Sequence, residues 1–219
     1  MTEKDTEMTA QPKDKTRNTT DKRILDKIKN HNRGKIFFPE DFSDTGSVDA
    51  IRQALHRLAK DGFIVRLAHG IYLCPKQDKK LGTLYPPVEE IAKAIAIRDK
   101  ARIIPTGLQA LNKLGLSTQV PLKVVYLTDG APRSIQIGKR TIKFKKTTPK
   151  NLLANGEISS LVIQALREIG KDNVTNEQLA RIHKLLQKED LQKVLYDARL
   201  APAWIAKIML AAKNNKVES

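Results

Sequence analysis

Two apolar stripes at helical spacing organise the first part of the chain. The first predicts a helix from Asp21 to about residue 29, after a polar stretch over residues 1–20 with almost no large apolar side chain. Such a stretch cannot bury enough surface to order itself, so residues 1–20 are predicted to be a disordered tail. The second stripe predicts a helix over 48–60 with Ser47 as its N-cap. Its buried side is expected to consist of Val48, Ile51, Leu55 and Leu58.

Between and after these helices the pattern is typical of short strands and tight turns. A short apolar run at 36–38 is followed by a predicted one-turn helix at 39–42. Apolar runs at 63–65 and 71–74 predict a β-hairpin around a glycine-containing tip. The order of helix, short helix, amphipathic helix and hairpin is the layout of a winged helix-turn-helix. We expect such a domain over residues 21–80.

The remaining chain changes to a mixture of helices and strands, and then to helices alone. Residues 81–150 predict two helices, a buried strand at 124–127 and a hairpin over 134–145. Residues 151–219 predict only helices, either as a separate region or as one domain with 81–150. The expected fold class is α+β: an N-terminal winged helix-turn-helix, a small α/β middle domain with a basic hairpin, and C-terminal helices.

Charge narrows the class of partner. The 219 residues include 40 lysines and arginines against 24 acidic residues, a net charge of +16, and residues 81–150 alone hold 13 against 4. So large a surplus favours polyanions such as DNA or RNA. Seven cations without an intervening acid form a candidate second phosphate-contacting surface: Arg133, Lys139, Arg140, Lys143, Lys145, Lys146 and Lys150. The alternatives are an edge hairpin protected by lysines against strand pairing and a surface for an acidic protein.

The polar side of helix 48–60 carries residue types that read base edges in a major groove. Gln53 suits adenine and Arg52 suits guanine, and residues near the helix start are expected to lie deepest in the groove. The predicted recognition residues are Ser47, Asp49, Arg52, Gln53, His56, Arg57 and Lys60. Of these, Arg57 and Lys60 are assigned to phosphates. Two wing contacts are assigned to the hairpin tip, namely Arg66 and His69. The alternative is an ordinary amphipathic helix with a solvated charged face.

Two segments of the sequence carry a family resemblance. They are Ser47-x3-Ile51-x3-Leu55-x-Arg57-Leu58-x3-Gly62-Phe63-Ile64-x-Arg66-Leu67-x2-Gly70-Ile71-Tyr72 and Ile104-Pro105-Thr106-Gly107 through Leu114-Gly115-Leu116. Residues 20–150 thereby resemble the AbiEi-type antitoxin and transcriptional regulator family of type IV toxin–antitoxin systems. The resemblance implies a repressor of its own operon that counteracts a nucleotidyltransferase-like toxin. It also implies that the winged helix binds operator DNA and that the second domain carries the antitoxin function.

Catalytic and export motifs are missing from the sequence. There is no phosphate-binding loop and no His-Glu-x-x-His pair. Cys74 is the only cysteine, which excludes internal disulfides, and its place at the end of a β run favours a core or edge role. We therefore expect no enzyme activity, no metal and no cofactor. No apolar stretch has the length of a membrane span or an export signal, so the cytoplasm is the expected location.

These observations converge on a sequence-specific DNA-binding regulator, a monomer or weak dimer that binds an inverted-repeat operator. The alternative is an RNA-binding or RNA-modifying protein that uses the basic middle domain. With 5% aromatic residues, the chain offers few stacking platforms for single strands, which disfavours this alternative. A protein-interaction role without nucleic acid is a third hypothesis.

Overall fold

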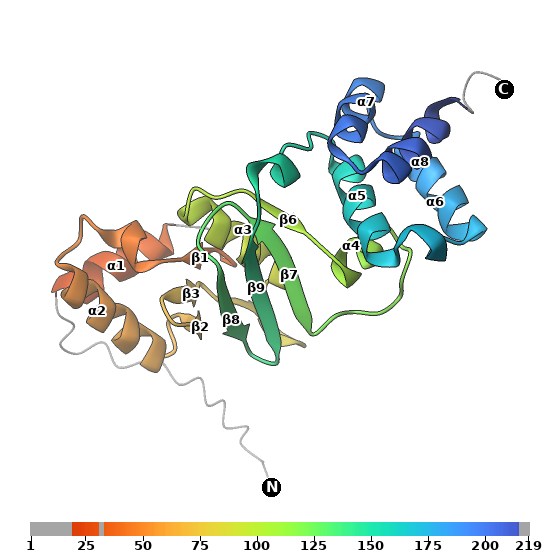
Figure 1. Ribbon diagram of the computed structural model, residues 1–219. Helices are drawn as coiled ribbons and strands as arrows, with labels where there is room; N and C mark the ends of the chain where they lie inside the picture. Colours follow the sequence, from red (N-terminus) through yellow and green to blue (C-terminus); the bar gives the residue numbers. More distant parts are fainter. Residues whose placement is uncertain (1–18, 31–32, 215–219) are drawn as a thin grey trace, which may run out of the picture. The chain divides into compact units, whose positions relative to one another are not determined.

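The computed structural model describes residues 19–30 and 33–214 (Figure 1). It is a mixed α+β protein, as predicted. The chain divides into two compact units, residues 1–86 and 87–219, which we call unit 1 and unit 2. The C-terminal helices therefore belong to the same unit as the middle region.

Unit 1 combines two helices with two small sheets. Its elements are α1 (Thr19–Lys29), β1 (Ile36–Phe37), η1 (Pro39–Phe42), α2 (Val48–Lys60), β2 (Val65–Ala68), β3 (Ile71–Leu73), β4 (Lys76–Asp78) and β5 (Gly82–Leu84). Of the tail predicted over 1–20, residues 1–18 lie outside the described residues, and the last two begin α1. Strands β1, β3 and β2 form one antiparallel sheet in that order. Buried side chains of α1, α2 and this sheet, including Ile24, Leu55 and Phe37, form a single core.

The helix predicted over 48–60 is confirmed, and so is its cap. The Ser47 hydroxyl accepts a hydrogen bond from the Ala50 N–H at 3.3 Å. The predicted buried stripe was wrong at Val48, which is 60% exposed. The buried side is centred instead on Ile51, Ala54, Leu55 and Leu58. At 100° per residue, Val48 lies about 70° from that centre, and no earlier turn of the helix covers it.

The predicted hairpin is confirmed, but its strands and tip differ from the prediction. The N–H groups of Phe63 and Ile64 donate to the Leu58 carbonyl at 3.0 and 3.4 Å, so these residues close the helix rather than start the strand. Strand β2 begins at Val65, and Arg66 pairs with Tyr72 inside the ladder. The tip is therefore shorter than the predicted stretch 66–70.

Unit 2 contains a four-stranded sheet and a group of helices. Its elements are α3 (Val88–Arg98), β6 (Ile103–Pro105), α4 (Leu108–Lys113), β7 (Lys123–Thr128), β8 (Arg133–Ile137), β9 (Arg140–Lys146), η2 (Pro149–Leu152), α5 (Glu157–Ile169), η3 (Lys171–Asn173), α6 (Asn176–Leu186), α7 (Leu191–Leu200) and α8 (Ala203–Asn214). Helices α4 to α8 share a second buried core. The capping-box spacing of Thr175 and Gln178 predicts the start of α6, and the reciprocal hydrogen bonds are present.

The sheet of unit 2 has the order β6-β7-β9-β8, with β8 at an edge. The predicted hairpin is confirmed as β8 and β9, which pair antiparallel. Strand β9 also pairs in parallel with β7, a partner that the sequence pattern does not indicate. The strand predicted as fully buried, β7, instead alternates, with Val124, Tyr126 and Thr128 buried. Figure 1 shows α3 behind this sheet.

Two carboxylates from the end of unit 2 hold the N-terminus of α5. Asp197 is fully buried and accepts hydrogen bonds from the Gly156 N–H at 2.9 Å and from the Ser159 hydroxyl. Glu189 accepts from the Ile158 N–H at 2.6 Å. The first N–H groups of a helix have no partner within the helix and favour negative charge. These acids therefore fasten the C-terminal helices to one another.

Candidate nucleic-acid interface

Helix α2 presents a polar face to solvent over its whole length. The exposed residues on this face are Ser47, Asp49, Arg52, Gln53, His56 and Lys60. The Arg52 side chain is 65% exposed, and its nearest carboxylate oxygen, on Asp49, is 3.8 Å away. This face therefore offers amide, imidazole and guanidinium groups that the described structure of unit 1 leaves directed outward. Six of the seven predicted recognition residues lie on it.

Arg57, the seventh predicted recognition residue, is engaged within unit 1. Its Nε and Nη2 donate to the two carboxylate oxygens of Asp21 at 2.8 and 2.6 Å. Asp21 belongs to α1 and is 4% exposed. The hydrogen bond to Asp21 raises the pKa of the Arg57 guanidinium above its ordinary value. Arg57 thus ties α1 to α2, and the geometry does not support its assignment to a phosphate.

Val48 is a candidate contact that the sequence pattern assigned to the core. It is the first residue of α2 and lies one turn before Arg52, so the two side chains are neighbours on the helix surface. Exposed apolar side chains on a groove-reading helix contact the methyl group of thymine. The clue available from the sequence was its position in the first turn, at the margin of the stripe.

The two predicted wing residues lie together beside the β2–β3 turn. Both Arg66 and His69 are exposed, and Arg66 Nη2 lies 3.1 Å from His69 Nδ1. Arg66 projects from a paired strand, whereas His69 lies in the turn itself. This places a guanidinium and an imidazole side by side at the end of the β2–β3 hairpin.

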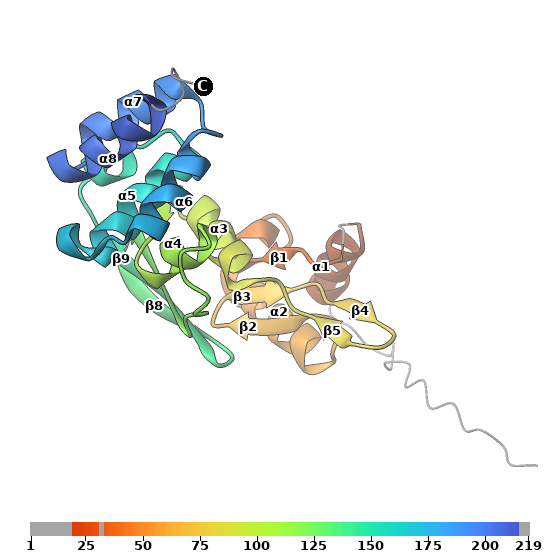
Figure 2. The same ribbon diagram turned by 90° about the vertical axis from the view of Figure 1, so that its right-hand side faces the viewer.

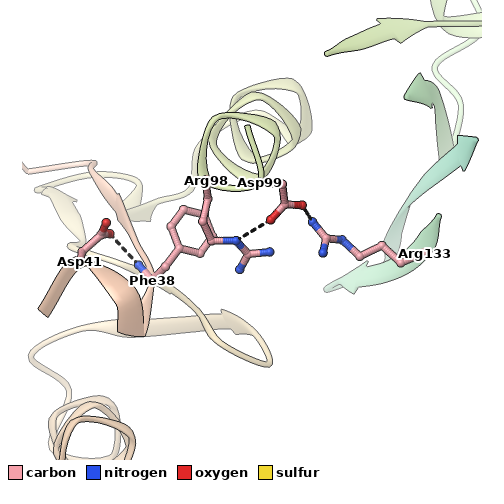
Figure 3. Close-up of polar contacts among 5 residues, drawn as sticks. All are labelled: Phe38, Asp41, Arg98, Asp99 and Arg133. Atoms are coloured by element: carbon pink, nitrogen blue, oxygen red, sulfur yellow. Dashed lines mark hydrogen bonds and ion pairs between the residues drawn. The ribbon is translucent and has the colours of Figure 1, made fainter. Parts of the chain in front are cut away.

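The basic hairpin β8–β9 contains one cation that is not available at the surface. Arg133 is half-buried, forms an ion pair with Asp99, and lies with its guanidinium carbon 5.6 Å from the centre of the Phe144 ring. Figure 3 shows Asp99 between Arg133 and Arg98, whose Nε donates to the same carboxylate at 2.9 Å. Burial lowers the pKa of Arg133 below its ordinary value. This arginine ties the edge strand to α3.

Figure 3 also shows a local contact in unit 1. The Phe38 N–H donates to the Asp41 carboxylate at 2.9 Å. It satisfies a donor at the start of η1, which leads into the turn before α2. The short helix predicted between the first strand and α2 is therefore confirmed.

The other six predicted cations of the hairpin region stay at the surface. Lys143 is half-buried, and the rest are exposed: Lys139, Arg140, Lys145, Lys146 and Lys150. Strand alternation places Lys143 and Lys145 on the face opposite to Ile142 and Phe144. Since the buried face packs toward α3, these two lysines lie on the other side of the sheet.

The described residues include no group of three or more His, Cys, Asp or Glu side chains placed to hold a metal ion. Burial raises the pKa of the half-buried Cys74 thiol, which lowers its thiolate fraction at neutral pH. Within the described helices, none has the length and apolar character needed to cross a bilayer.

A family of unknown function, DUF6088, matches residues 23–194, and this chain belongs to that family. Among solved structures, the crystal structure of the RV2827C protein from Mycobacterium tuberculosis is similar at 13% identity and a TM-score of 0.43, covering 89% of this chain and 82% of that chain. Among curated proteins, no relative is found. The antitoxin role and the toxin partner implied by the resemblance to AbiEi-type proteins stay predictions, since none of these matches names either.

Proposed function

We propose that this DUF6088 protein is a sequence-specific DNA-binding regulator in which unit 1 acts as a winged helix-turn-helix. Helix α2 is the recognition helix, and the β2–β3 hairpin is the wing. The observation that carries the proposal is the exposed face of α2, which combines hydrogen-bonding and apolar side chains along one helix held rigidly from behind. The major groove of B-DNA is wide enough to admit one such helix.

The support for α2 is what makes its face useful for reading bases. Its inner side is fully buried at Leu55 and Leu58, which have no exposed surface. The Arg57–Asp21 pair fixes the helix against α1 with two hydrogen bonds. A rigid helix loses little conformational entropy when it enters a groove, so its base contacts contribute more fully to affinity.

Four exposed residues of α2 have a chemical counterpart on DNA. Gln53 matches the N6 and N7 atoms of adenine, Arg52 matches O6 and N7 of guanine, and Val48 matches the thymine methyl group. Lys60, at the far end of the helix, is suited to a phosphate. A purely solvated charged face does not need this mixture of groups.

The exposed cations of the β8–β9 region supply the second part of the proposal. Lysines neutralise phosphates without reading sequence, so this surface adds affinity that depends on salt and not on base order. The proposed division of labour is that α2 selects the site and the hairpin strengthens the complex.

The experiment begins with selection of duplexes from a random pool by the purified full chain. Dissociation constants are then measured on a selected and a scrambled duplex. Gln53→Ala is expected to weaken the selected complex by about 1–3 kcal/mol and to leave the scrambled one unchanged. Gln192→Ala, an exposed glutamine of α7, is the matched control. Equal losses on both duplexes would remove the base-reading role of Gln53.

The same binding measurement, made with RNA, distinguishes the proposed DNA-binding function from the RNA-binding alternative. A single-stranded RNA of equal length is expected to bind more weakly than the selected duplex at every salt concentration. Tighter binding of the RNA, together with no enrichment of any duplex, would overturn the proposal in favour of that alternative.

A further inference from the structure

Strands β4 and β5 form a second hairpin that follows the wing directly. We call residues 76–84 the finger. Its register pairs Lys76 with Leu84, Gln77 with Thr83 and Asp78 with Gly82. The sequence pattern did not indicate it, because its residues lack the apolar alternation of a half-buried strand. Figure 2 shows β4 and β5 extending away from the sheet of β1, β3 and β2.

The tip of the finger is held in one shape by its own hydrogen bonds. The Asp78 carboxylate accepts from the N–H groups of Lys80 and Leu81 at 2.8 and 2.9 Å. These hydrogen bonds, the one from Leu81 first, lower the pKa of Asp78 below its ordinary value. A side-chain hydrogen bond of 3.0 Å joins Gln77 to Thr83 across the two strands. The one acid of the finger therefore serves the backbone of the tip.

The base of the finger is anchored to the body of unit 1. Cys74, between β3 and β4, donates its N–H to the Lys35 carbonyl at 2.9 Å and accepts from the Gly34 N–H at 2.8 Å. Beyond this point the finger contributes no residue to the buried core of the unit. A two-stranded hairpin of this kind is only marginally stable by itself. The shape of its tip is therefore maintained by the Asp78 hydrogen bonds and not by packing into the core of unit 1.

The tip presents two cations and an apolar side chain in a row. Lys79 and Lys80 are exposed, and Leu81 is 77% exposed. Lys76 adds a third exposed cation on β4. Proteins that grip the minor groove combine cations on the phosphates with an apolar wedge at the base steps. The composition of the tip fits duplex DNA, in which phosphates and apolar base steps lie side by side along the minor groove.

We propose that the finger is a second DNA-contacting arm beside the wing. Lys79 and Lys80 contact phosphates, and Leu81 enters the minor groove. Each strand of the finger has three residues, which gives it a reach of about 10 Å, equivalent to about three base-pair steps. This inference rests on the proposed DNA binding by α2 and adds a contact outside the site that α2 reads.

The test of the lysine contacts uses the full chain with Lys79→Ala and Lys80→Ala combined. The slope of log Kd against log salt is expected to fall by about 1.8, since each phosphate contact contributes about 0.9. The protected region on a selected duplex is expected to shorten by about three base pairs at one end. The ratio of affinities for selected and scrambled duplexes stays unchanged, because phosphate contacts carry no base preference. Lys184→Ala with Lys188→Ala, two exposed lysines near the end of α6, is the matched control.

The test of the apolar contact uses Leu81→Ala. We expect a smaller bend in the bound duplex, measured by energy transfer between dyes at its ends, with an unchanged salt slope. All three residues are exposed, so the variants are expected to keep the thermal unfolding midpoint of the parent chain. An unchanged bend removes the wedge role of Leu81.

The outcomes distinguish this inference from the proposed function. An unchanged salt slope and an unchanged protected region in the lysine variant overturn the finger while leaving base reading by α2 intact. A loss equal to that of the α6 control also overturns it, because the effect then follows net charge alone. Failure of the parent chain to select any duplex overturns both the finger and the proposed function.

Discussion

Helix α2 and the β8–β9 hairpin are both exposed and both cationic, but they present different chemistry. The face of α2 mixes an amide, an imidazole, a guanidinium, an ammonium and an apolar side chain. The outward side of the hairpin presents the two lysines 143 and 145, among threonine, serine and glutamine neighbours. Base edges differ in their donors, acceptors and methyl groups, whereas phosphates are all alike. Under the proposed function, this difference assigns base selection to α2 and phosphate binding to the hairpin.

The two regions also share one feature that charge counting obscures. In each, one arginine is paired with an aspartate: Arg57 with the buried Asp21, and the half-buried Arg133 with Asp99. A guanidinium suits this use because its fork of donors matches both oxygens of a carboxylate. The lysines, which lack this geometry, are left at the surface. The cations available to a ligand are therefore fewer than the sequence suggests.

The largest effect is expected from removing the cations of the β8–β9 hairpin that are proposed to contact phosphates. A variant with alanine at Lys139, Arg140, Lys143 and Lys145 loses four phosphate contacts, so its salt slope falls by about 3.6 and its affinity at 0.1 M salt drops by roughly three to four orders of magnitude. Binding assays on selected and scrambled duplexes should show the same loss. Its control has alanine at four exposed lysines of the C-terminal helices: Lys171, Lys184, Lys188 and Lys193. A comparable loss in the control would mean that net charge alone matters.

The next effect is a change of stability with pH, caused by a tyrosine on the buried face of the sheet that contains the hairpin. Burial raises the pKa of Tyr126 to about 12, and its ring stacks on Phe144 at 6.0 Å. The folded state thus favours the neutral phenol over the phenolate. The resulting contribution to the free energy of unfolding is complete below about pH 10 and is lost as the pH rises through about 12. Urea unfolding followed by the fluorescence of Trp204, the single tryptophan, should show this loss.

The matched variant for this effect is Tyr126→Phe, which cannot ionise. Its stability is expected to fall by about 2 kcal/mol less than that of the parent chain between pH 10 and pH 12. Identical pH profiles for the two proteins would show that the phenol does not titrate in this range.

The third prediction distinguishes the structural role of Arg57 from the base contacts proposed for the exposed residues of α2. Arg57→Ala leaves the buried Asp21 carboxylate without its partner. Breaking a buried pair costs about 3–5 kcal/mol, and the half-exposed guanidinium reduces this to about 2 kcal/mol. Urea unfolding followed by circular dichroism checks it. Arg57→Lys should recover only part of the loss, because an ammonium lacks the planar fork of donors with which a guanidinium aligns one N–H on each carboxylate oxygen.

DNA binding decides between the two roles of Arg57. Under conditions where Arg57→Ala remains folded, its affinity for a selected duplex should stay within about threefold of the parent value, an effect no larger than one exposed contact. A loss of a hundredfold in the folded variant would restore the phosphate contact predicted from the sequence.

The smallest effect tests the proposed contact between Val48 and a thymine methyl group. Replacing thymine by deoxyuridine in a selected duplex removes the C5-methyl group, worth about 0.8 kcal/mol when buried. Val48→Ala should lower the affinity for the thymine duplex by a similar amount and abolish the difference between the two duplexes. The four dissociation constants form a double-mutant cycle. Equal sensitivity to deoxyuridine in both proteins places the methyl contact elsewhere.

The local structure of this protein could be predicted well from its sequence. The span of α2, the Ser47 cap, the capping box of α6 and the β8–β9 hairpin all follow from signals within a few residues of one another. The finger could not be predicted, since its hydrogen bonds replace the apolar alternation that indicates a strand. Val48 was misplaced because periodicity gives the angle of a side chain but not where the neighbouring core ends.

The sequence by itself determined where the β2–β3 and β8–β9 hairpins and the helix α2 form, and that the chain carries a large positive charge. Tertiary structure decided which of those charges remain available. Asp21 and Arg57 are 36 residues apart in the sequence, and Asp99 and Arg133 are 34 apart. The parallel strands β7 and β9 are likewise not consecutive, because β8 lies between them in the sequence. Such pairs form only where packing brings distant segments together, and burial then makes a partner necessary for each charge. The periodicity of apolar residues along one element carries no information about which charged residues will form such pairs.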